Sequence, residues 1–160
     1  MAHLLDRNKL KSLADLLHQL NKKIVATNGT FDIFHAGDVH LLGNAKSLGD
    51  ALIVGINSDS SVKKNKGDDR PVISQDLRAM VISSIVYVDY LHIFDEESPI
   101  EFLEAVRPDV YVNNIDYGEN CVEAQTVGKY GGRLVLLEKV PELLSESQII
   151  DKIVKVYGNK

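Results

Sequence analysis

The chain of 160 residues contains a single cysteine, Cys121. One thiol excludes an intrachain disulfide and any metal site built only from thiolates, so we expect a reducing, cytoplasmic setting. The first twenty residues interrupt their leucines with five charged side chains and lack the continuous apolar core of a signal peptide. No apolar run is long enough to span a membrane, and we expect no membrane partner.

The chain also has no excess of positive charge. It contains 18 lysines and arginines and 23 acidic residues, which give a net charge of −5. A broad electrostatic grip on nucleic acid needs clustered cations, so we expect no nucleic-acid partner. A local basic pocket for one nucleotide is still compatible with this balance. The hydrophobic content of 44% is ordinary for a globular protein, and the length allows one domain with a real core.

Apolar runs alternate with helical patterns along the chain, without repeats. The strands are expected at 24–26, 51–56, 86–90 (which 91–94 either extends or follows as a short neighbour), 109–112 and 133–137. The helices are expected at 3–20, 38–48, 74–84, 98–107, 121–130 and from Ser145 onward, with a charged loop at 63–71. This order favours α/β, a Rossmann-like doubly wound parallel sheet of five strands in a three-layer α/β/α arrangement. We expect one domain over residues 1–160, with the helix within residues 1–21 packed on it.

Residues 24–49 form the segment around which the rest is organised. A short β-branched run meets a glycine-bearing loop, and an amphipathic helix begins near Asp38. Ligands of α/β proteins bind beyond the carboxyl ends of the strands. Free N–H groups and the dipole at a helix start favour a phosphate there, which the imidazole of His35 could contact.

The loop sequence resembles a known family. Residues 27–37, Thr-Asn-Gly-Thr-Phe-Asp-Ile-Phe-His-Ala-Gly, are similar to the signature of the cytidylyltransferase-like nucleotidyltransferases. A narrower resemblance, to the adenylyltransferase domain of ADP-heptose synthase and also to glycerol-3-phosphate cytidylyltransferase, rests on Asn57-Ser58-Asp59, Lys63, Lys66-Gly67-Asp68 and Arg70-Pro71. It extends from about residue 22 to residue 154. It implies an enzyme that moves a nucleoside monophosphate from an NTP, accompanied by Mg²⁺, to a phosphorylated sugar or alcohol, with release of pyrophosphate.

The same resemblance implies a role for each site residue. The catalytic group comprises His35, Lys63 and Lys66. The nucleotide-binding group comprises Asn28, Gly29, Thr30, Phe31, Gly37, Asp38, Asp116, Ser145 and Ser147. The acceptor-binding group comprises Asp32, Asp59 and Arg78, and no residue is assigned to a metal.

Simpler interpretations exist for several of these residues. Phe31 is equally compatible with plain core packing, and Asp32 with ordering of its loop. Asp59 would instead cap the helical turn after it, and Arg78 would form a surface or dimer ion pair. The lysines would belong to a solvated loop.

Asp38 stands where the second histidine of the His-x-Gly-His element is expected. Two unit charges about 4 Å apart repel by about 1 kcal/mol in water and about 4 kcal/mol at a surface-like dielectric, so an acid beside a triphosphate would be costly. Asp38 would alternatively serve as a helix N-cap or help to hold Mg²⁺ through an oxygen ligand. His40 is expected on the opposite face of the helix, about 200° further round.

Two further segments depart from the family pattern. Asn113-Asn114-Ile115-Asp116-Tyr117 replaces a Lys-Gly-Gly-Asp-Tyr run, and Ser145-Glu146-Ser147 replaces Ser-Thr-Thr. Together with Asp38, these changes are expected to make the pocket less cationic.

The resemblance favours ATP and a heptose 1-phosphate as substrates. The alternatives are CTP with glycerol 3-phosphate, or a nucleotide-binding paralogue weakened by the three departures. We also expect a homodimer, from the resemblance and from Met80, Val81 and Ile85 on the helix after the lysine-rich segment.

Overall fold

The computed structural model describes residues 1–118, 121–138 and 140–158. Its strands are β1 (His3–Leu4), β2 (Ile24–Gly29), β3 (Ala51–Asn57), β4 (Tyr90–Phe94), β5 (Val110–Asn114) and β6 (Arg133–Leu137). Its helices are α1 (Arg7–Gln19), α2 (Ala36–Lys46), α3 (Asp59–Lys66), α4 (Gln75–Ser83), α5 (Ile100–Val106), the 3₁₀ turn η1 (Ile115–Tyr117), α6 (Val122–Lys129) and α7 (Glu146–Tyr157).

All strand pairs are parallel, and the strands lie in the order β1-β4-β3-β2-β5-β6. From β2 the chain moves outward through β3 to β4, then returns to the other side of β2 at β5. The carboxyl ends of β2 and β5 therefore form the switch point at which open α/β sheets bind ligands. The doubly wound parallel sheet is confirmed.

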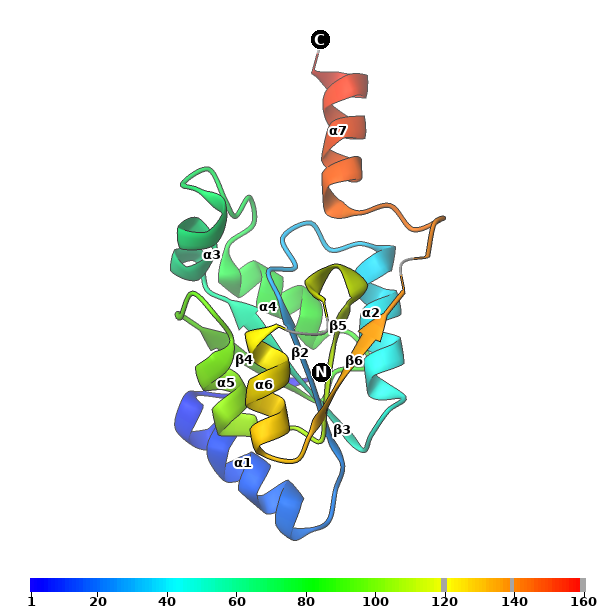
Figure 1. Ribbon diagram of the computed structural model, residues 1–160. Coiled ribbons are helices and arrows are strands. Elements are labelled where there is room, and N and C mark those ends of the chain that lie inside the picture. The colour runs from blue at the N-terminus through cyan, green and yellow to red at the C-terminus, as the bar shows by residue number, and fades with distance from the viewer. Residues whose placement is uncertain (119–120, 139, 159–160) are drawn as a thin grey trace.

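Two apolar layers cover the sheet, so the three-layer arrangement is also confirmed (Figure 1). Leu41 and Leu42 of α2 pack with Ile82 of α4 on one face. Leu10 of α1 and Phe102 of α5 pack on the other face, together with side chains of α6. β2 and β3 are buried on both sides, which explains their continuous apolar runs.

The sheet has six strands, not five, because residues 3–4 pair with β4 at its edge. The helix expected at 3–20 accordingly begins at Arg7, where the Asp6 side chain accepts from the Lys9 N–H. The strand expected at 86–90 is also misplaced. Val86 is 85% exposed and the N–H of Val88 donates to Ile85 O, which makes this segment a turn, and β4 occupies 90–94.

The lysine-rich segment is helical through Lys66, whereas a loop was expected at 63–71. Ser58 caps α3 by accepting from the Ser61 N–H, and Gly67, with φ +93°, ends it. Lys63 and Lys66 therefore lie on the last turn of a helix that follows β3. Figure 1 also shows α7 projecting away from the body of the protein, and none of its side chains is buried. Among the described residues, no helix is long and apolar enough to cross a membrane.

Candidate functional site

The loop between β2 and α2 is shaped by a close contact of its own residues. Phe31 has φ +52° and is buried, and its ring covers Gly29. A Cβ at Gly29 would stand 3.1 Å from that ring, so only glycine fits without displacing it. Phe31 thus packs in the core and also fixes the course of the loop that leads to α2.

His35 caps the N-terminus of α2. Its Nδ1 accepts from the N–H of Gly37 at 3.0 Å, and Asp38 Oδ2 accepts from the His35 N–H at 2.9 Å, which makes a reciprocal capping box. Because Nδ1 is an acceptor here, the imidazole proton lies on Nε2. A Cβ at Gly37 would stand 2.8 Å from the ring, so glycine lets His35 lie over the helix start. His35 therefore offers its Nε2–H as a hydrogen-bond donor.

Asp38 is the third residue of α2 and not its N-cap, which corrects one of the expected alternatives. Its carboxylate folds back onto the His35 backbone N–H. Burial raises the pKa of the Asp38 carboxyl, while the bond from His35 N–H and the nearby imidazole oppose that shift. Burial thus favours the uncharged form of the acid that was expected to repel a triphosphate.

This shift predicts the pH dependence of an Asp38→Asn variant. A carboxyl whose pKa is higher in the folded state contributes stability below its unfolded pKa, near 3.8, and loses it as the pH rises through the folded value. Urea unfolding is therefore expected to show the variant gaining on the wild type as the pH rises from 4 to 7. Asp50→Asn is the control, because the Lys23 N–H lowers the pKa of Asp50, so the stability that this carboxyl contributes is lost only as the pH falls below about 4, and little change is expected from pH 4 to 7. Parallel responses of both variants would contradict the assignment.

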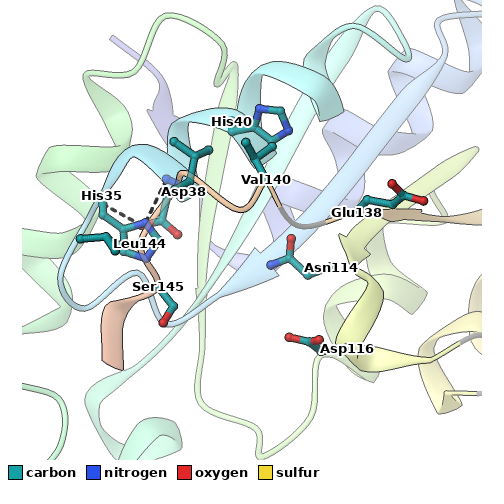
Figure 2. A pocket seen from close by; sticks show the side chains of 11 residues that line it. His35, Asp38, His40, Asn114, Asp116, Glu138, Val140, Leu144 and Ser145 are labelled. Carbon is teal, nitrogen blue, oxygen red and sulfur yellow. Dashed lines mark hydrogen bonds and ion pairs between the residues drawn. The ribbon is translucent and has the colours of Figure 1, made fainter. Parts of the chain in front are cut away.

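A pocket of about 230 Å³ opens beside this helix start. Figure 2 shows His35, Asp38 and Ser145 gathered on one side, and Asn114 with Asp116 facing them from the end of β5. The structure thus brings together several of the residues expected at the nucleotide. Gly37 also lines the pocket, whereas the exposed Ser147 on α7 does not.

His40, expected on the opposite face of α2 from Asp38, also lines this pocket. The cavity extends around the N-terminal end of α2 as far as Glu138 and Val140. The angle between residues 38 and 40 on the helix did not indicate this extent. Helical spacing identified which residues share a face of α2 but not how far the segment after β6 would reach.

Asp32 is buried and lies at the centre of a tight polar cluster. Its carboxylate accepts from Arg70 Nε at 3.0 Å and from the backbone N–H groups of Val72 and Ile73 at 2.9 and 2.8 Å. Arg70 also pairs with Glu146 at the start of α7. Asp32 therefore orders the loop before α4, and its contact with an acceptor stays a prediction. The charge of Glu146 is compensated by Arg70, a residue to which sequence reasoning gave no role.

Arg78 is 1% exposed, so the alternative of a surface ion pair is wrong. Its guanidinium donates to Ile73 O, Thr30 O and Asp59 Oδ1. Asp59 in turn accepts from the Gln75 N–H, at the first residue of α4, at 2.8 Å, and it does not cap its own helix, where Ser58 is the N-cap. Arg78 thereby connects the loops after β2 and β3 to the start of α4.

A second pocket of about 290 Å³ lies on the other side of the β2 loop. Asn28, Gly29 and Thr30, which were expected to bind the nucleotide, do not line the first pocket but line this one, together with Asn57 and Lys66. Desolvation and the positive charge of Arg70 lower the pKa of the Lys66 ammonium, which an incoming anion would offset. Lys63 is exposed on the same helix and does not line this pocket.

No group of three or more histidine, cysteine, aspartate or glutamate residues clusters as a metal site within the described ranges. Asp38 and Asp116 nonetheless place two carboxylates along the first pocket. Mg²⁺ commonly takes one or two carboxylates together with substrate phosphates, so the residues present fit an ion that arrives with a nucleotide.

Comparisons with known proteins show the relatives of this chain. The "Bifunctional protein HldE" of Campylobacter jejuni subsp. doylei is 47% identical over 149 residues, which cover 91% of this chain and 31% of the relative. Its counterpart from Geobacter metallireducens is 44% identical over 140 residues, 87% of this chain and 28% of the relative. The chain thus spans about a third of the length of these relatives.

Two solved structures share the fold. A lipopolysaccharide core biosynthesis protein from Thermoplasma volcanium has a TM-score of 0.60 at 27% identity and covers 74% of this chain and 97% of its own. A pantoate-beta-alanine ligase from Francisella tularensis has a TM-score of 0.68 at 17% identity, covering 97% of this chain and 78% of its own, and supports the fold alone. The family model described as "Cytidylyltransferase-like" matches residues 26–153. The chain therefore belongs to the cytidylyltransferase-like family.

Proposed function

We propose that this protein transfers a nucleoside monophosphate from an NTP to a sugar phosphate and releases pyrophosphate. The observation that carries this proposal is the pair of pockets flanking the carboxyl end of β2. One pocket has the helix start and His35 that suit a triphosphate, and the other has amides and Lys66 that suit a phosphorylated acceptor. The two substrates would thus meet across a single loop.

The residues support a mechanism of positioning and charge stabilisation. The backbone N–H groups at the start of α2 and the Nε2–H of His35 would bind phosphoryl oxygens. Lys66, with Lys63 on the same turn, would offset the negative charge that gathers as the acceptor phosphate approaches the α-phosphorus. The acceptor phosphate would attack the α-phosphorus in line, without a covalent enzyme intermediate. Asp38 and Asp116 would help to hold Mg²⁺ together with the triphosphate, and the ion would supply charge neutralisation of the phosphates.

We propose ATP and a heptose 1-phosphate as the substrates, because the relatives are bifunctional HldE proteins at 44–47% identity and the sequence resembles the adenylyltransferase domain of ADP-heptose synthase. CTP with glycerol 3-phosphate is the alternative pair. The test is pyrophosphate release across NTPs and phosphorylated acceptors, next to an active nucleotidyltransferase as control. Absence of turnover with every pair would refute the proposal.

A paralogue that binds nucleotide without transfer is the second candidate, favoured by Asp38 in place of a histidine. Asp38→His separates the two functions. We expect the variant to lose rate in an active wild-type enzyme, because the capping box that orients His35 is broken. A large gain in rate, with nucleotide binding by the wild type seen in calorimetry, would instead favour the weakened paralogue.

We also propose a homodimer formed through α4. Met80 is 64% exposed and Val81 and Leu77 lie beside it, whereas Ile85 packs against the core and does not contribute. A monomeric mass in light scattering at micromolar concentration would contradict this proposal.

A further inference from the structure

The floor of the second pocket contains two amide side chains, Asn28 and Asn57, each only 9% exposed. Asn28 lies opposite Gly55 in the β2–β3 register, and Asn57 follows two residues later on β3. Residues two apart on a strand face the same side of the sheet, so both amides project toward the same pocket. A buried amide is useful for recognition only if its oxygen and nitrogen have fixed positions.

Two hydrogen bonds fix the orientation of Asn28. Asn113 Nδ2 donates to Tyr111 Oη at 3.1 Å, and the Tyr111 hydroxyl donates to Asn28 Oδ1. The phenol has one proton, and with Asn113 as its donor it gives that proton to Asn28. The Asn28 oxygen is thus turned inward, and its Nδ2 remains on the side of the pocket as a donor.

Asn57 has the opposite orientation. Its Nδ2 donates to Ser61 Oγ at 3.0 Å, and the Ser61 hydroxyl donates to Glu96 O at 2.6 Å. Ser61 therefore receives the amide N–H, and Asn57 Oδ1 is left toward the pocket as an acceptor. Asn28 and Asn57 thus contribute a donor and an acceptor, from adjacent strands, to the same pocket.

We infer that Tyr111 and Asn113 are positioning residues that hold Asn28 as a hydrogen-bond donor for the acceptor substrate. A sugar hydroxyl both accepts and donates, so neighbouring hydroxyls fit the Asn28 and Asn57 pair, while Lys66 suits the phosphate. This inference rests on the proposed function for the identity of the ligand. Asn113 stands where the family resemblance predicts a lysine. It adds no positive charge to the pocket and instead begins the hydrogen-bond chain from Asn113 through Tyr111 to Asn28, which we call the relay.

Tyr111→Phe removes the hydroxyl and keeps the buried ring. We expect the KM for heptose 1-phosphate to rise about tenfold, the cost of one lost or misoriented hydrogen bond, while the KM for the NTP changes less than about twofold. The Asn28 side-chain amide signals in ¹⁵N NMR are expected to shift or broaden. Tyr87→Phe, on a tyrosine remote from this relay, is the matched control and is expected to change none of these quantities.

Asn113→Asp is the second variant. Its carboxylate only accepts, so the Tyr111 proton would turn toward residue 113 and Asn28 would lose its fixed orientation. We expect the same selective rise in acceptor KM. Equal rises for both substrates, or an unchanged acceptor KM, would overturn the inference.

The two hypotheses fail separately. If the wild type transfers nothing to any acceptor, the proposed function fails. The relay is then tested by the Asn28 amide signals and by calorimetric binding of heptose 1-phosphate. Unchanged signals and unchanged affinity in Tyr111→Phe would overturn the relay as well.

Discussion

Replacing His35 with alanine is expected to lower the rate of nucleotidyl transfer by about 100- to 1,000-fold, the usual effect of removing one preorganised donor to a developing oxyanion. The change also removes the cap of α2, which costs about 1 kcal/mol of stability. Steady-state pyrophosphate release and urea unfolding would measure the two effects. His3→Ala, on the exposed edge strand, is the matched control.

His35→Asn separates the two roles of this side chain. Asparagine is a good N-cap, so stability is expected to stay near that of the wild type, while the shorter side chain loses the reach of Nε2. Wild-type turnover in this variant would show that His35 is a helix cap and nothing more.

Replacing Arg78 with methionine is expected to destabilise the fold by about 3 kcal/mol, because it leaves buried carbonyl groups without their donor and Asp59 without its cation. Urea unfolding measures the loss, and Arg133→Met on an exposed arginine is the control. Arg78→Lys is expected to restore only part of the stability, because one ammonium does not reproduce the fork geometry of a guanidinium. A loss of stability below about 1 kcal/mol would mean that the segments joined by Arg78 keep their structure without its hydrogen bonds.

Much of the fold could be predicted, because β2 and β3 are buried on both faces and their apolar runs have no other stable arrangement. The edge strand β1 could not, since two residues carry no pattern and pair only because β4 offers an open edge. The prediction of a strand at 86–90 was wrong because a turn outweighed the alternating pattern. The alternation of Val86, Tyr87 and Val88 is compatible with a strand, but the turn from Ile85 determines their position.

For the site, the loop motif identified His35, Gly37 and Asp38, which the structure brings together around one helix start. Partners distant in sequence were not visible. Arg70 lies 38 residues from Asp32, and only the folded chain shows that it also pairs with Glu146. Residue types indicated the chemistry of the site. The direction of Asp38 follows from the local capping box with His35, and that of Arg78 from tertiary contacts.

The ion pairs of Arg70 have a consequence for how substitutions combine. Asp32, Arg70 and Glu146 share one guanidinium, so they form a single energetic unit and not three separate sites. Neighbours in one salt-bridge network commonly show interaction energies of about 0.5–3 kcal/mol. Restoring the threonine expected at position 146 would therefore have a different effect when Arg70 is present than when it is absent. Any attempt to convert this ion-pair network to the family pattern has to change these positions together.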